Sequence, residues 1–95
     1  MAIPVAPLRS AARLAMRGNR RAQRDLTIAI VSAKEMAILN WRFLKHKGPT
    51  DVLAFEPGDV VVCPEVAKRE ALARGIDWHE ELARYVIHGC LHLRG

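Results

Sequence analysis

Residues 26–44, LTIAIVSAKEMAILNWRFL, contain the clearest structural signals of the chain. Leu26–Val31 is an apolar run rich in β-branched residues, which predicts a buried β-strand. Ser32-Ala-Lys-Glu35 follows directly and matches a capping box, in which the serine side chain accepts from a first-turn amide and the glutamate reaches back. We therefore expect a helix from this box to about Leu44, with Gly48-Pro49 as the break after it.

Strands and helices alternate on both sides of this segment. Two short strands are expected to form a hairpin, and further helices are expected before and after them. The expected strands are 51–55 and 59–63, joined by Glu56-Pro57-Gly58. The expected helices are Pro7–Arg17, with Pro7 at its first position and Gly18-Asn19 as its stop; Pro64 to Gly75; and a C-terminal helix opened by a second capping box, Asp77-Trp-His-Glu80. No repeat or linker interrupts the pattern, which predicts one α+β domain over residues 1–95, a small mixed β-sheet packed with helices.

Length and composition exclude several classes of protein. Ninety-five residues hold one hydrophobic core, and 51% hydrophobic with 26% charged residues is typical of a folded chain rather than a disordered one. The longest apolar runs fall far short of the roughly 20 residues that span a bilayer. Cys63 and Cys90 form neither a CxxC pair nor a disulfide framework, which favours a reducing, cytoplasmic location.

Positive charge is concentrated at the N-terminus. The net charge is +5, yet residues 1–24 contain six arginines and no acidic residue. Arg9, Arg13 and Arg17 lie about one turn apart on one face of the expected first helix. An arginine-rich, acid-free start is also typical of an organelle transit peptide. The stripe is interpreted either as a contact for RNA phosphates or as a solvated face.

The residues richest in chemistry are His88 and His92. Their spacing of four places both imidazoles on one face of the expected C-terminal helix, as two ligands of a tetrahedral Zn²⁺ would require. The alternative is a solvated or partly buried pair, and flanking apolar residues such as Ile87 and Leu91 would half-bury such imidazoles. Gly89 stands where the H-E-x-x-H zinc proteases carry their glutamate, which argues against that mechanism. Gly95 is placed to end the helix and turn the chain.

Three motifs, in order from about Leu26 to Gly95, resemble those of the YbeY family. His88-Gly-Cys-Leu-His92-Leu-Arg-Gly95 is similar to the family signature HGxLHLxGYDH. Leu39-Asn40, followed by Gly48-Pro-Thr-Asp-Val-Leu-Ala-Phe55, resembles the block LN…PTDVLSFP, and Gly58-Asp-Val-Val61 resembles GDIxI.

The resemblance implies an α+β fold with a mixed sheet and a metal-site helix near the C-terminus. It implies one zinc ion held by His88, His92 and a third histidine. It also implies a single-strand-specific endoribonuclease that acts in 16S rRNA 3′-end maturation and ribosome quality control. The implied partners are rRNA and the small ribosomal subunit, with neither DNA nor a membrane. No residue is identified as a general base, and the oligomeric state stays open.

The chain departs from the family pattern in two places. The sequence stops at Gly95, before the Tyr-Asp-His that would supply the third metal ligand, so we expect a YbeY-like domain that lacks its C-terminal part. The family commonly has an arginine where this chain has Leu44. Arg42, Lys45 and Lys47 are the expected substitutes for phosphate contact, or else a solvated helix end. Both departures favour the alternative function, a non-catalytic RNA- or ribosome-binding assembly factor.

Several other residues are expected to be structural. Trp41 and Trp78 are predicted to pack in the core rather than to stack on RNA bases. Cys90 is predicted to face away from the histidines as a buried thiol. Thr50-Asp51 is expected to organise the turn into the second strand, near the metal cleft. His46 and His79 are expected at the surface.

Overall fold

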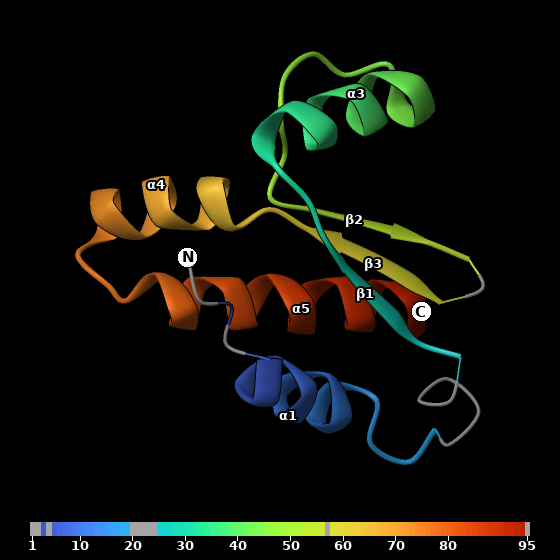
Figure 1. The fold of residues 1–95 in the computed structure, drawn as a ribbon. Helices are drawn as coiled ribbons and strands as arrows, with labels where there is room; N and C mark the ends of the chain where they lie inside the picture. The colour runs from blue at the N-terminus through green and yellow to red at the C-terminus, as the bar shows by residue number, and fades with distance from the viewer. Residues whose placement is uncertain (1–2, 4, 20–24, 57, 95) are drawn as a thin grey trace.

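A computed structural model describes residues 3, 5–19, 25–56 and 58–94 of the chain. Three strands form one sheet in the order β1-β3-β2, where β1 is Thr27–Ile30, β2 is Val52–Phe55 and β3 is Asp59–Val62. β1 is parallel to β3 and β2 is antiparallel to it, so the sheet is mixed. Figure 1 shows the long helix α5 (Trp78–Arg94) beneath the strands, α1 (Val5–Ala15) beneath α5, and α3 (Ala33–Leu44) above the strands. The predicted α+β class with a small mixed sheet is confirmed.

The hairpin forms as the sequence predicts. Val52 pairs with Val62 and Phe55 with Asp59, so β2 and β3 are in direct antiparallel register. Pro57, in the connection between them, lies outside the described residues. β3 is the central strand, with β1 and β2 on its two sides, and α5 packs against it. Its three valines are buried.

β1 is only half-buried, which corrects the prediction of a buried strand. It pairs with β3 on one side and occupies the edge of the sheet, where Thr27 and Ile30 are exposed. An apolar, β-branched run is typical of a strand with two covered faces, but the sequence carries no information about which strand is at an edge.

The capping box at the start of α3 is confirmed. The Glu35 amide donates to Ser32 Oγ at 3.1 Å, and the Ser32 amide donates to Glu35 Oε1 at 3.2 Å. Glu65 adds a third cap, because its carboxylate accepts from the Ala33 amide at 3.3 Å. Glu65 belongs to α4 (Pro64–Arg74), so this bond joins two helices.

α3 ends at Leu44, as the sequence predicts. Lys45 takes the left-handed conformation, with φ of 58°, and its amide donates to the carbonyls of Asn40 and Trp41. The buried Asn40 side chain donates to the Gly48 carbonyl at 2.9 Å and so draws the following loop back beneath the helix. The side-chain bond of Asn40 therefore fixes the path of the loop that follows α3. Asn40 belongs to the Leu39-Asn40 motif, which therefore has a structural role.

α1 begins two residues earlier than predicted. Pro7 lies in the first turn rather than at the first position, which costs no hydrogen bond because first-turn amides have no acceptor within the helix. The buried residues of α1 form a stripe against α5: Leu8, Ala11, Ala12 and Ala15.

α4 packs against α5. Pro64 begins α4, and Gly75, with φ of 70°, ends it as predicted. Of the second capping box, the structure shows the Asp77 carboxylate accepting from the His79 amide at 2.8 Å. Gly95, predicted to end α5, lies outside the described residues. None of the described helices combines the length and the apolar character that a membrane crossing would need.

The two tryptophans differ in burial. Trp78 packs against the edge of the core, with Lys68 Nζ at 4.7 Å from the centre of its ring. Trp41 is 51% exposed, so the prediction of a core residue is wrong for Trp41. It lies on the outer face of α3, which packs through Met36 and Asn40 instead.

Candidate functional site

His88 and His92 lie one turn apart on α5, and both side chains are exposed. Their exposure corrects the expectation that flanking apolar residues half-bury them: Ile87 is partly buried and Leu91 is 51% exposed. Cys90 faces the core and is fully buried, and burial raises the pKa of its thiol. It is therefore confirmed as a structural thiol that points away from the histidine face.

Gly89 explains how α5 reaches the sheet. A Cβ atom at this position would lie 2.6 Å from Val60 Cγ1 and 3.0 Å from Val52 Cγ2, closer than van der Waals contact allows. Glycine thus lets α5 pack directly on β2 and β3 and fixes the direction in which the flanking histidines point. A glutamate here would collide with the sheet, which is a physical reason why the protease motif is absent.

His88 lines a cavity of about 330 Å³ beside α5, in which charged side chains lie among apolar ones. An adjoining cavity of about 370 Å³ shares four of its lining residues. The four shared residues are Asp51, Arg74, Glu81 and Tyr85. Asp51 accepts from the Val52 amide at 2.8 Å and from Thr50 Oγ1 at 3.2 Å, which confirms its predicted turn role and places it in the same cavity as His88.

Glu81 is a buried carboxylate held by two arginines. Its side chain is 2% exposed, and its Oε1 atom accepts from Arg84 Nη1 at 2.9 Å and from Arg74 Nη1 at 3.4 Å. Arg74 comes from the end of α4, so its pair with Glu81 joins α4 to α5, whereas the Arg84 pair lies within α5. Arg84 also lines the His88 cavity. The spacing of Glu81 and Arg84 fits one helix face, but the sequence reasoning missed this cluster because Arg74 joins it only through folding.

Tyr85 lies next to this cluster. The residue is 5% exposed, and its hydroxyl lies near the Glu81 carboxylate without a hydrogen bond of good geometry to any residue that the structure describes. Burial, followed by the nearby Glu81 carboxylate, raises the pKa of Tyr85 well above its ordinary value of 10.0. The phenol therefore stays protonated at neutral pH and can serve only as a neutral group.

The cations predicted near Leu44 lie elsewhere. Arg42, Lys45 and Lys47 are exposed at the end of α3 and in the loop after it, and none lines the cavities beside His88. Lys45 Nζ lies 5.6 Å from the centre of the Trp41 ring. Leu44 is 49% exposed. The cations that do share the His88 cavity are Arg74 and Arg84.

The arginine stripe of α1 is also separate from the histidine pair. Arg9, Arg13 and Arg17 are exposed, as either interpretation of the stripe requires. Arg9 and Arg13 line a groove against β1, whereas the His88 cavity includes Asp51, just before β2. β1 and β2 are opposite edges of the sheet, so the structure brings these two sets of residues to different sides of β3.

His88 and His92 could supply two of the ligands of a zinc site. Two exposed imidazoles at this spacing match two positions of a tetrahedral ion. Within the described residues, no group of three histidine, cysteine or carboxylate side chains is arranged to hold a metal. The remaining positions would have to be filled by water, by substrate or by a donor outside the described part of the chain.

A family model and curated proteins that match this chain carry the same name, Endoribonuclease YbeY. The family described as Endoribonuclease YbeY matches residues 8–95. A protein named Endoribonuclease YbeY from Acidothermus cellulolyticus is 39% identical over 75% of this chain and 56% of its own length. One of the same name from Blochmanniella pennsylvanica is 39% identical over 75% of this chain and 52% of its own length.

A solved structure is also similar. The solution structure of TM1509 from Thermotoga maritima matches with a TM-score of 0.66 and 29% identity, over 96% of this chain and 64% of that one. The chain spans about half the length of the curated relatives it matches. With 88 of its 95 residues matched by the family and the three motifs in place, this chain belongs to the YbeY family.

Proposed function

We propose that this chain carries the metal-binding helix of a zinc-dependent, single-strand-specific endoribonuclease that acts in 16S rRNA 3′-end maturation and ribosome quality control. The observation that carries the proposal is the exposed His88–His92 pair, held in place by the close packing of Gly89, in a chain of the Endoribonuclease YbeY family.

In this proposal His88 and His92 bind one zinc ion as neutral imidazoles. When bound, the ion would polarise a phosphate oxygen or lower the pKa of a water molecule. Arg74 and Arg84 line the cavity beside His88 and are held in place by Glu81, so they would orient a phosphate there. Arg42, Lys45 and Lys47 would contact the RNA backbone further along.

The test is zinc content and RNA cleavage measured together. We expect about one zinc per chain in the unaltered protein and little in His88→Ala or His92→Ala. His46→Ala is the matched control, since it removes an exposed histidine outside the pair. A labelled single-stranded RNA should be cut only by zinc-loaded protein, and a duplex of the same sequence should not be cut.

A chain extended after Gly95 by Tyr-Asp-His supplies a third imidazole at the position where the family signature has one. We expect this variant to bind zinc more tightly than the 95-residue chain and to lose that gain in His88→Ala. Equal zinc affinity in the two chains, with unchanged zinc content in the alanine variants, would contradict the proposed site.

The second candidate function is an RNA- or ribosome-binding assembly factor without catalysis. It is favoured by the absence, within the described residues, of a third metal-ligating side chain beside the histidine pair. A factor of this kind would bind single-stranded RNA with an affinity that falls as the salt concentration rises. Neither a metal chelator nor His88→Ala would change that affinity. Cleavage that depends on both histidines excludes this candidate.

A further inference from the structure

An exposed stripe of side chains runs along the outer face of α3. Its members lie three or four residues apart and so share one helix face: Lys34, Ile38, Trp41, Arg42 and Lys45. All five are exposed, Ile38 at 55% and Trp41 at 51%. Figure 1 shows α3 above the sheet, with α5 on the other side of the strands. A tryptophan that the core does not use is available to a ligand at this surface.

The charge around the stripe is positive. Residues 33–48 contain four lysine or arginine residues and a single carboxylate, that of Glu35. This carboxylate is engaged at the start of the helix, where it accepts from the Ser32 amide at 3.2 Å. At the other end, Lys45 Nζ lies over the Trp41 ring, 5.6 Å from its centre. The aromatic ring is therefore surrounded by cations, and a negatively charged ligand is complementary to it.

An exposed ring among cations matches single-stranded nucleic acid in particular. A base stacks on the ring while the phosphates on either side of it pair with the cations. The Lys45 ammonium group can cover only one face of the indole, so the other face stays available to a base. The chain belongs to a family described as Endoribonuclease YbeY, which makes RNA the relevant polyanion.

The loop after α3 connects this stripe to the cavity of His88. Lys45 is the C-cap of α3, and Asp51 lines the His88 cavity. Six residues separate the two positions, so their Cα atoms lie at most about 20 Å apart. The Asn40 side chain fixes the path between them through its 2.9 Å bond to the Gly48 carbonyl. One short RNA strand can therefore reach both the stripe and the cavity.

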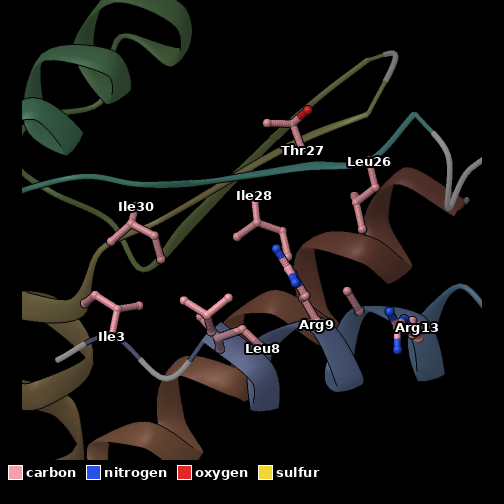
Figure 2. Close-up of a pocket in the computed structure, with 10 residues that line it drawn as sticks. Ile3, Leu8, Arg9, Arg13, Leu26, Thr27, Ile28 and Ile30 are labelled. Atoms are coloured by element: carbon pink, nitrogen blue, oxygen red, sulfur yellow. The ribbon is translucent and has the colours of Figure 1, made fainter.

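Another basic surface of the molecule offers no such ring. Figure 2 shows the groove between α1 and β1, where Arg9 and Arg13 lie among aliphatic side chains such as Leu8 and Ile28. Of the described residues that line this groove, none is aromatic. The groove has cations for phosphates but no platform for a base, so base stacking is expected on α3.

We propose that the α3 stripe is a second contact for single-stranded RNA, in which a base stacks on Trp41 and phosphates pair with Arg42 and Lys45. The choice of RNA rests on the proposed function, but the contact needs neither metal nor the histidine pair. Trp41 is then a positioning residue, because it holds a strand whose other part lies in the His88 cavity. Every base can stack on an indole, so this contact adds affinity with little sequence preference.

Fluorescence of Trp41 tests the proposal on the full chain. Trp78→Phe leaves Trp41 as the one tryptophan of the sequence, so its emission reports on α3. The ligand is an adenylate decamer, titrated with a chelator present so that the strand stays uncut. The control ligand is an abasic ribose-phosphate chain of equal length, which carries the charge without the bases. We expect the decamer to quench the emission and to bind at least about fivefold more tightly than the abasic chain.

Variants of Trp41 separate stacking from charge, with affinity measured by the anisotropy of end-labelled RNA. Trp41→Ala should weaken binding of the decamer by about fivefold or more and leave binding of the abasic chain unchanged. The slope of log affinity against log salt should stay the same, because no cation is removed. Trp41→Phe keeps an aromatic ring and should restore most of the affinity. Leu72→Ala, which removes an 84% exposed side chain from α4, is the control and should have no effect.

Several results would overturn the proposal: no quenching by the decamer, equal affinity for the two ligands, or full affinity in Trp41→Ala. Quenching that requires zinc or is lost in His88→Ala would contradict it as well. Emission that shifts with protein concentration alone would identify a contact between copies of the chain instead.

The outcome is independent of catalysis. Zinc-dependent cleavage together with unchanged binding in Trp41→Ala would refute the stacking contact and leave the endoribonuclease standing. Binding that depends on Trp41, without zinc uptake or cleavage, would support the contact and refute the endoribonuclease.

Discussion

The close contact between α5 and the sheet leaves no room at position 89 for a side chain larger than the hydrogen atom of glycine. Glycine ordinarily weakens a helix by about 1 kcal/mol relative to alanine. Here the Cβ of alanine would lie 2.6 Å from Val60 Cγ1, and moving apart costs more than the helix gains. We expect Gly89→Ala to lower the free energy of unfolding by about 1–2 kcal/mol, measured by urea denaturation.

The double variant Gly89→Ala with Val60→Ala is the control for this steric explanation. Shortening Val60 removes the atoms that the new Cβ would meet first, so Gly89→Ala should cost less in this background than alone. If Gly89→Ala stabilises the unaltered protein, the close contact between α5 and β3 is not a constraint.

Tyr85 gives a prediction that depends on pH. It is the sole tyrosine of the sequence, so its ionisation can be followed directly by absorbance at 295 nm. Its pKa is raised in the folded state, mainly by burial. The unfolded chain therefore releases the phenol proton first, and stability should fall as pH rises above 10. We expect the folded protein to show no tyrosinate near pH 10, where the urea-unfolded chain is half ionised.

Tyr85→Phe separates the phenol from the other groups that ionise in alkali. This variant should lose the part of the alkaline destabilisation that belongs to Tyr85. At pH 7 it should be as stable as the unaltered protein or more stable by up to about 1 kcal/mol, because it removes a buried hydroxyl without a partner. A loss of more than 1 kcal/mol would mean that the hydroxyl has a partner after all.

At the scale of elements, α3 depends on the two hydrogen bonds of its capping box. Ser32→Ala removes the acceptor of the Glu35 amide and should lower the free energy of unfolding by about 1 kcal/mol. Glu35→Gln keeps an oxygen that can accept from the Ser32 amide and should cost less. Ser10→Ala, at an exposed position within α1, is the control and should stay within about 0.5 kcal/mol of the unaltered protein.

At the scale of the whole molecule, RNA affinity should report where the phosphate contacts lie. Each contact to single-stranded RNA contributes about 0.7 to the slope of log affinity against log salt. If Arg42, Lys45 and Lys47 each bind a phosphate, changing all three to alanine should reduce the slope by about 2. Lys34→Ala, an exposed cation at the other end of α3, should change it little. An unchanged slope in the triple variant would place the contacts elsewhere.

The sequence by itself determined most of the elements and the chemical identity of the histidine pair. Local signals such as the Ser32–Glu35 box, Pro64 and Gly75 act within one or two turns, so they can be read along the chain. The spacing of His88 and His92 likewise fixes a shared helix face without knowledge of the rest of the fold.

Only the tertiary structure decided what surrounds these elements. It placed β1 at an edge, exposed Trp41 and assembled Asp51, Arg74 and Glu81 from three separate segments beside His88. Burial and pairing of this kind depend on contacts between residues far apart in the chain. Gly89 illustrates the division: the sequence shows only that a glutamate is missing there, and packing against Val60 shows why none can fit.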